Sequence, residues 1–231
     1  MDLTRREFLG YTAGAVSMMG LPITGPAGAE APSQRYQRWW TIYSDPNSYD
    51  CESMRGYWSV LPPERAHASV GDPAPLDRCA LLIVPYCASL QPTMLGRLLW
   101  ALHGGTTVVM ETGAGFVSHH MFRQHRRWLR EELRIHIATR MDLWSNPKYT
   151  REPYIEFTWP RRAKIRDFSR VVAPADCPGD DAIAWAGDMA VAVRRRVGKG
   201  TLIYLGSPVG PALWAGDIQA RRWLHAVAHA A

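Results

Sequence analysis

The 231-residue sequence lacks most features that would assign it at once to a membrane, metal-binding or repeat class. Beyond residue 30 no apolar run approaches the ~20 residues that a membrane-spanning helix needs. Its four cysteines contain no CxxC pair, so their spacing does not support a zinc site. The sequence shows no internal repeat and no low-complexity tract. We therefore expect one globular domain with no membrane span in the mature chain, no metal and no other cofactor.

The first 29 residues have the order of parts found in an export signal. A basic pair within RREFL (5–9) precedes a short apolar segment (10–21) and a small-residue site, Ala27-Gly28-Ala29. This order resembles the twin-arginine signal of bacteria, which implies recognition by the twin-arginine translocase, cleavage near Ala29 and a periplasmic location. In that oxidising compartment the cysteines Cys51, Cys79, Cys87 and Cys177 permit one or two disulfides of unassigned pairing.

Positive charge exceeds negative charge, with a formal net charge of +6 at pH 7. The arginines gather in three stretches, residues 123–134, 161–162 and 194–196. Such stretches are usually solvated faces of helices and strands. The expected export argues against nucleic acid as a partner. An acidic protein surface or an anionic lipid is the alternative that suits the charge better.

Residues 80–116 predict a strand, a helix and a second strand. Leu81–Val84 are continuously apolar, as in a strand buried on both faces. Apolar residues then recur at helical spacing over 94–102, Gly104-Gly105 ends the helix, and β-branched residues fill 106–110. Two buried strands joined by a helix favour a parallel pair with a right-handed crossover.

The remaining elements extend this unit in both directions. Before it we expect a strand at 39–43, a helix at 49–61 and a short strand at 67–70. After it we expect a helix at 118–132, strands at 133–137, 154–159 and 165–172, hairpin strands at 183–185 and 189–195, a strand at 201–205 and a helix at 213–230. The pattern predicts an α/β fold: helices on both faces of a mostly parallel sheet with a late antiparallel insertion.

Three motifs carry a resemblance to a known superfamily. They are VPY (84–86), GGTTVVMETG (104–113) and GKGTLIYLGSP (198–208). Together they resemble the class I glutamine amidotransferase-like superfamily, in its degenerate branch such as the trimerisation domain of certain β-galactosidases. The resemblance implies a flavodoxin-like three-layer α/β/α sandwich, with residues 30–231 forming one amidotransferase-like domain. It also implies a protein partner or a homo-oligomer.

Active members of that superfamily carry a cysteine on the sharp turn after the third major strand, supported by a late His-x-Glu pair. In this sequence we match the turn to residues 111–115, so the nucleophile position falls on Thr112 or Gly113. Neither residue is a cysteine, and residues 206–210 contain no His-x-Glu pair. The superfamily's catalytic residues therefore cannot be carried over to this chain, which favours a domain that is not an enzyme and leaves other catalytic activity open.

Ligands of open α/β sheets bind beyond the carboxyl ends of the strands. Glu111 is the most suggestive residue at this rim, because a carboxylate that ends a buried strand needs a partner or an altered pKa. Backbone N–H groups of the glycine turn that follows would provide a purely structural partner. The candidate ligand-binding residues at this rim are Asp45, Tyr86, Cys87, Glu111, Thr112, Gly113, Ser118, His119 and Ser207.

Three functional hypotheses remain open. The first is an exported non-catalytic domain that binds a partner protein or a small ligand in the periplasm. The second is a periplasmic hydrolase or transferase with a rebuilt site around Cys87, Glu111 and His119, with Cys87 as a thiol nucleophile rather than a disulfide partner or a core residue. The third is an accessory or assembly factor for a cofactor-bearing periplasmic enzyme.

The ten tryptophans are many for a chain of this length. Tryptophan is enriched in the hot spots of protein interfaces, but it is also common in hydrophobic cores. A partner-facing patch would draw on Trp39-Trp40, Trp58, Trp144 and Trp159.

Overall fold

The computed structural model describes a large part of the chain downstream of the expected export signal. The described residues are 39–44, 51–61, 66–70, 79–87, 92–112, 119–139, 141–143, 147, 153–169, 171–176 and 181–231. The leader, its cleavage site, Asp45, Gly113 and Ser118 lie outside these ranges. Of Cys87 and His119 the structure describes the backbone alone.

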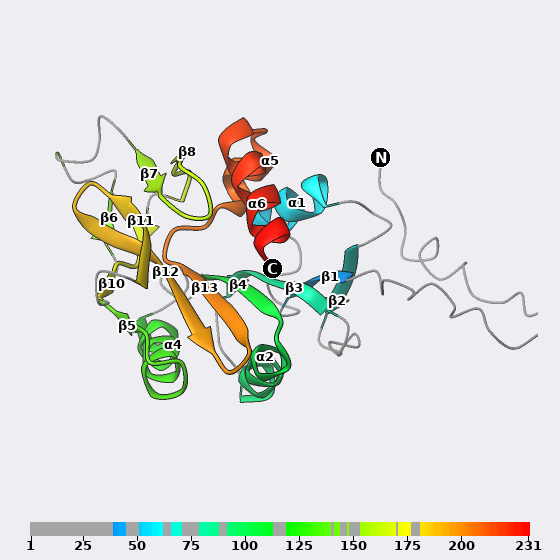
Figure 1. The fold of residues 1–231 in the computed structure, drawn as a ribbon. Helices are drawn as coiled ribbons and strands as arrows, with labels where there is room; N and C mark the ends of the chain where they lie inside the picture. The colour runs from blue at the N-terminus through cyan, green and yellow to red at the C-terminus, as the bar shows by residue number, and fades with distance from the viewer. Residues whose placement is uncertain are drawn as a thin grey trace, which may run out of the picture. The chain divides into compact units, whose positions relative to one another are not determined.

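One nine-stranded sheet forms the centre of this fold (Figure 1). Its order is β2-β1-β3-β4-β13-β12-β11-β7-β8. The first five strands in this order pair in parallel, and the other four join them in antiparallel fashion. Their bounds are β1 Trp39–Ser44, β2 Ala66–Val70, β3 Cys79–Cys87, β4 Thr107–Thr112, β7 Tyr154–Phe157, β8 Ala163–Arg166, β11 Ala182–Ala186, β12 Met189–Val197 and β13 Gly200–Leu205. The predicted mixed α/β class and the late antiparallel strands are confirmed.

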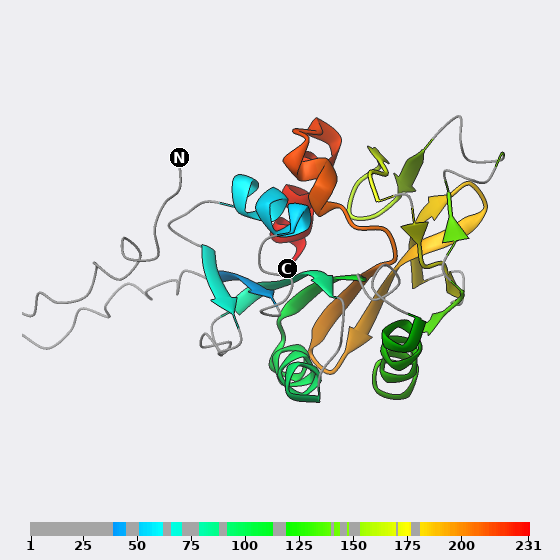
Figure 2. The same cartoon turned by 180° about the vertical axis from the view of Figure 1, so that it is seen from behind.

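Helices cover both faces of the sheet (Figures 1 and 2). On one face lie α1 (Glu52–Val60), α5 (Gly210–Trp214) and α6 (Ile218–Ala230). On the other face lie α2 (Pro92–Gly104) and α4 (His119–Glu132). Two separate hydrophobic clusters match these two faces, so each face of the sheet has its own core.

Alternation along the strands explains the two cores. Leu81 and Ile83 of β3 belong to the cluster on the α1 face, whereas Leu82 and Val84 belong to the cluster on the α2 face. The same rule on β4 places Val109 on the α1 face, with Val108 and Met110 on the opposite face. Consequently Glu111 belongs on the α1 face and Thr112 on the α4 face, although they are adjacent in sequence.

Several elements differ from the sequence prediction. The single helix expected at 213–230 is broken into α5 and α6, because Gly216 has a φ of +80° and Asp217 caps α6 by accepting from the N–H groups of Gln219 and Ala220. The strand expected at 165–172 is two strands, β8 and the short β9 (Val171–Val172). No strand was expected between 137 and 154, but Met141–Asp142 form β6, which pairs with β9. The short β5 (His136–Ile137) pairs with β10 (Ala175–Asp176).

Candidate functional site

The carboxylate of Glu111 lies at the carboxyl end of β4 and has no exposure to solvent. Five protein donors surround it. Oε1 accepts from Tyr57 Oη at 2.7 Å, from the Val209 N–H at 2.7 Å and from the Gly210 N–H at 2.8 Å. Oε2 accepts from Ser53 Oγ at 2.5 Å and from the Tyr86 N–H at 3.3 Å. A carboxylate offers about four lone-pair positions, so these bonds use its accepting capacity fully.

Close packing of α1 against α5 brings these donors together. A Cβ on Gly56 would lie 1.9 Å from the Gly210 carbonyl oxygen, and a Cβ on Gly210 would lie 2.4 Å from Ser53 Cα. Only glycine at both positions allows the two helix backbones to approach this closely. The approach aims the first N–H groups of α5 at Glu111, which caps a helix whose own N-cap residue, Val209, forms no side-chain cap.

The electrostatics of this cluster favour a structural carboxylate over a reactive one. Burial raises the pKa of Glu111 above its ordinary value, while the bonds from Ser53, Tyr57, Gly210 and Val209 pull it back. Burial, followed by the Glu111 charge, also raises the pKa of Tyr57 well above its ordinary value. The pKa of the Cys51 thiol at the start of α1 is raised by burial as well. The raised pKa values keep the Cys51 thiol and the Tyr57 hydroxyl protonated at neutral pH, so neither is a ready nucleophile.

Backbone strain marks the end of β3. Tyr86 has a φ of +46°, a conformation that is uncommon for a residue other than glycine. The Tyr86 N–H donates to Glu111, so the strained residue near the end of β3 is hydrogen-bonded to the buried carboxylate. Counted along the chain, β3 is the third strand and β4 the fourth. The strained Tyr86 lies within β3, one residue before its end. The turn that the sequence predicts at residues 111–115 follows β4, and beyond Thr112 it lies outside the described residues.

Thr112 faces the opposite core, as the alternation on β4 requires. Its Oγ1 lies 3.1 Å from Nε2 of His125, a residue of α4 with no solvent exposure. His125 Nδ1 has no hydrogen-bond partner within the described part of the chain. Burial lowers the pKa of His125 to about 4, so the imidazole is neutral at pH 7.

Ser207 belongs to a third polar group. Its Oγ donates to Oδ1 of the buried Asp167 at 2.9 Å, and Ser169 Oγ donates to the same atom at 2.6 Å. This group ties the end of β13 to the segment after β8. Ser207 is therefore engaged with Asp167 in the structure, not with Glu111.

Of the candidates taken from the sequence, the structure brings together Glu111 and the Tyr86 backbone. Thr112 and Ser207 bond elsewhere, and Cys87 is placed only through its backbone pairing with Thr112 in the parallel ladder. The glycine turn lies outside the described residues, and the backbone donors that the structure shows are those of Tyr86, Val209 and Gly210. Sequence reasoning missed Ser53, Tyr57, His125, Asp167 and the two N–H groups of α5, most of which reach the site from distant parts of the chain.

The remaining sequence expectations have mixed outcomes. Cys51 and Cys79 form no disulfide in the structure, while Cys177 and the side chain of Cys87 lie outside its description. No group of potential metal ligands occurs among the described residues. Likewise, within these residues no helix is both long and apolar enough to cross a membrane.

The tryptophans differ in exposure to solvent. Trp58 is 47% exposed and Trp159 is half-buried. Trp100 and Trp214, which the sequence analysis did not single out, are 57% and 52% exposed.

No protein-family model matches the sequence, and comparison with curated proteins finds no match. Solved structures do match the fold. An exo-β-1,4-mannosidase from Opitutaceae bacterium strain TAV5 is 12% identical over 81% of this chain, with a TM-score of 0.59. A cold-adapted β-galactosidase from Rahnella sp. R3 is 15% identical over 83% of this chain, with a TM-score of 0.57. A cytoplasmic protein from Salmonella typhimurium LT2 is 10% identical over 83% of this chain, with a TM-score of 0.53.

The extent of each match differs. The chain covers 35% of the mannosidase and 31% of the Rahnella β-galactosidase, but 98% of the Salmonella protein. Across the similar mannosidase and β-galactosidase structures the share ranges from 25% to 35%. At these identities the likeness concerns the fold alone. The fold thus occurs both as a part of much larger glycosidases and as nearly the whole of a small protein.

Proposed function

We propose that this chain is an exported, non-catalytic domain of the class I glutamine amidotransferase-like type that binds a partner protein or a small ligand in the periplasm. The finer fold proposed with it is the flavodoxin-like three-layer sandwich. The parallel strand order β2-β1-β3-β4-β13 and the helices on both faces support that description.

One observation carries the non-catalytic part of the proposal. The carboxylate at the carboxyl edge of the parallel strands accepts five hydrogen bonds from its own chain and is fully buried. A general base needs a free lone pair within reach of a substrate proton. The lone pairs of Glu111 are occupied by protein donors, so its carboxylate has a structural role and links β4 to α1 and α5 through hydrogen bonds.

Two observations support binding as the activity. The fold forms a quarter to a third of several larger glycosidase chains, as expected of a module that serves other domains. In addition, Trp58 on α1 and Trp214 on the adjoining α5 expose about half of their surface. Exposed tryptophans are frequent anchors of protein interfaces. An accessory or assembly factor for a periplasmic enzyme is the particular form of this function that the sequence left open.

The enzyme hypothesis keeps one point in its favour. The strained Tyr86 directly precedes Cys87, and strained backbone often accompanies functional sites. A rebuilt site would use the Cys87 thiol with His119 and Glu111. The saturation of Glu111 argues against this arrangement, because one of its three groups already holds the fold together.

The test of this proposal is turnover of glutamine. We expect purified mature protein to release no ammonia from glutamine above a buffer blank, because neither Thr112 nor a late His-x-Glu pair offers an activated nucleophile. Thr112→Ala should change only stability, by about 1 kcal/mol, through loss of the contact to His125. Hydrolysis that disappears in Thr112→Ala or Cys87→Ala would establish the enzyme instead.

Export by the twin-arginine route is proposed from residues 1–29. Arg5→Lys combined with Arg6→Lys should leave the precursor in the cytoplasm, because the arginine pair is what the translocase reads. Cell fractionation followed by immunoblotting measures the distribution. Mature protein reaching the periplasm at the unmutated level would refute this route.

A further inference from the structure

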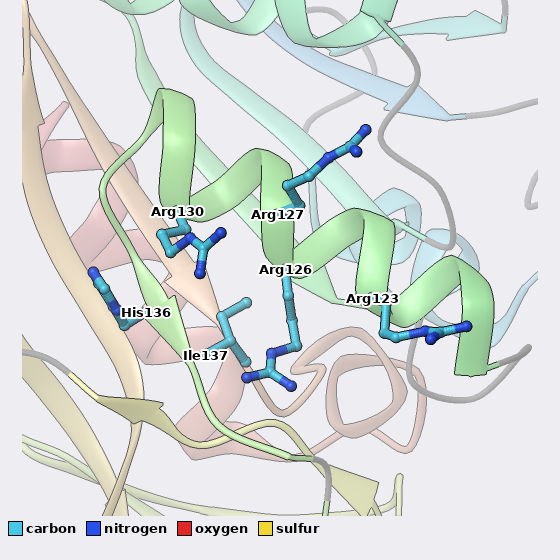
Figure 3. Close-up of a pocket in the computed structure, with 6 residues that line it drawn as sticks. All are labelled: Arg123, Arg126, Arg127, Arg130, His136 and Ile137. Carbon is cyan, nitrogen blue, oxygen red and sulfur yellow. The ribbon is translucent and has the colours of Figure 1, made fainter.

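We propose that the arginine face of α4 is a docking site for an acidic segment of a partner protein. The face consists of Arg123, Arg126, Arg127 and Arg130, which line a cavity of about 250 Å³ together with His136 and Ile137 of β5 (Figure 3). This inference rests on the proposed partner-binding function and names the chemistry of the partner.

Helical spacing gathers the arginines on one side of α4. Residues 123, 126 and 130 follow each other at intervals of three and four, so their side chains leave the helix on a common face. Figure 3 shows Arg126 and Arg130 extending toward β5, with Arg123 nearer the start of the helix and Arg127 directed away from the strand. At 1.5 Å per residue the backbone positions of Arg123 and Arg130 lie roughly 10 Å apart along the helix axis.

Four arginine side chains give this face its positive charge. Arg130 lies 3.8 Å from Glu131 Oε1, but the two side chains are 60% and 48% exposed, so this pair is weak. Arg127 makes a cation–π contact with the Trp128 ring, with 5.4 Å between Cζ and the ring centroid. The formal charge of +6 on the whole chain adds long-range attraction for an acidic partner.

Size and shape favour a peptide segment over an enclosed small molecule. A cavity of about 250 Å³ lies below the roughly 300–1,000 Å³ usual for small-molecule sites. An extended chain rises about 3.3 Å per residue, so three or four residues span the line of arginines. Carboxylates on such a segment match the planar, two-pronged donor geometry of arginine.

Fluorescence anisotropy of fluorescein-labelled octaglutamate tests the inference. We expect mature protein to bind octaglutamate in 50 mM salt at least tenfold more tightly than octaglutamine, and to lose most of this binding in 500 mM salt. Arg126→Gln combined with Arg130→Gln should weaken binding about tenfold. Arg123→Gln combined with Arg130→Gln should also weaken octaglutamate binding. Both positions are exposed, so this second variant replaces the first one if the first one folds poorly.

The matched control is Arg221→Gln combined with Arg222→Gln, two exposed residues of α6 on the opposite face of the sheet. This variant loses the same charge, so we expect less than a twofold change. Equal weakening in both pairs, or equal affinity for octaglutamate and octaglutamine, would overturn the site. Displacement of octaglutamate by equimolar inorganic phosphate would overturn the peptide in favour of a small oxyanion. If octaglutamate binding fails in these ways but the protein does not hydrolyse glutamine, only the arginine face is refuted as a docking site. If the protein hydrolyses glutamine, the proposed non-catalytic function is refuted.

Discussion

Glu111→Ala is expected to lower the free energy of unfolding by about 3–5 kcal/mol, the largest effect of any single substitution considered. The substitution removes the common acceptor of Ser53, Tyr57 and three backbone N–H groups, and it opens a cavity between β4 and α1. Each buried donor left without an acceptor costs about 1–3 kcal/mol. Urea denaturation followed by circular dichroism measures the change.

Two comparisons give this result its meaning. Glu111→Gln keeps the size of the side chain and one carbonyl oxygen, but its amide opposes the Tyr86 N–H, so we expect a smaller loss of about 1–3 kcal/mol. Glu156→Ala on β7 removes an exposed carboxylate that lies 3.6 Å from Lys164 Nζ, and it should cost about 1 kcal/mol or less. Equal effects of Glu111→Ala and Glu156→Ala would contradict a structural role for Glu111.

Acid should destabilise the protein through His125, by about 3 kcal/mol between pH 6.5 and pH 4. In the unfolded chain the imidazole takes up a proton near pH 6.5, but in the folded protein burial lowers its pKa to about 4. Between these values the unfolded state binds more protons, so the free energy of unfolding falls as the pH falls. The separation of about 2.5 pH units, at 1.36 kcal/mol per unit, gives the magnitude.

Urea denaturation at a series of pH values, in wild type and in His125→Gln, isolates this effect. The difference between the two stability curves should be constant above pH 6.5 and should change steadily below it. His225→Gln, at an exposed position of α6, is the matched control and should leave the pH dependence unchanged. The raised pKa of Glu111 acts in the opposite direction, lowering stability as the pH rises past the usual glutamate value, and it cancels in the comparison. Parallel curves for wild type and His125→Gln would contradict the burial of a neutral His125.

The central strand–helix–strand unit could be predicted because its signals are local. The apolar run at 81–84, the helical spacing at 94–102 and the β-branched run at 106–110 each specify one element, and β3, α2 and β4 confirm them. Of the expected strand at 133–137 only β5 forms, at its last two residues. The strands β6 and β10, which were not expected, contain two residues each, too few to show a period. The break between α5 and α6 was signalled by Gly216-Asp217, a glycine stop followed by a capping residue.

The site was predictable only in part. The need of Glu111 for a partner follows from its place at the end of a buried strand, and this prediction is confirmed. Its donors could not be identified, because Ser53 lies 58 residues before it and Gly210 lies 99 residues after it. His125 was within reach of sequence reasoning, since it lies four residues before Leu129 on the inward face of an otherwise arginine-rich helix.

A double-mutant cycle between Ser53 and Glu111 tests most directly whether the Glu111 carboxylate stabilises the fold through its hydrogen bonds. Ser53→Ala, Glu111→Ala and the double variant are compared with wild type by urea denaturation at pH 7, because alanine leaves no group at position 111 that could bond to Ser53. The 2.5 Å bond between Ser53 Oγ and Glu111 Oε2 predicts a coupling free energy of about 1–3 kcal/mol. Effects that add to within about 0.3 kcal/mol would show that the two groups do not act together in the folded protein, and the account of Glu111 would be wrong.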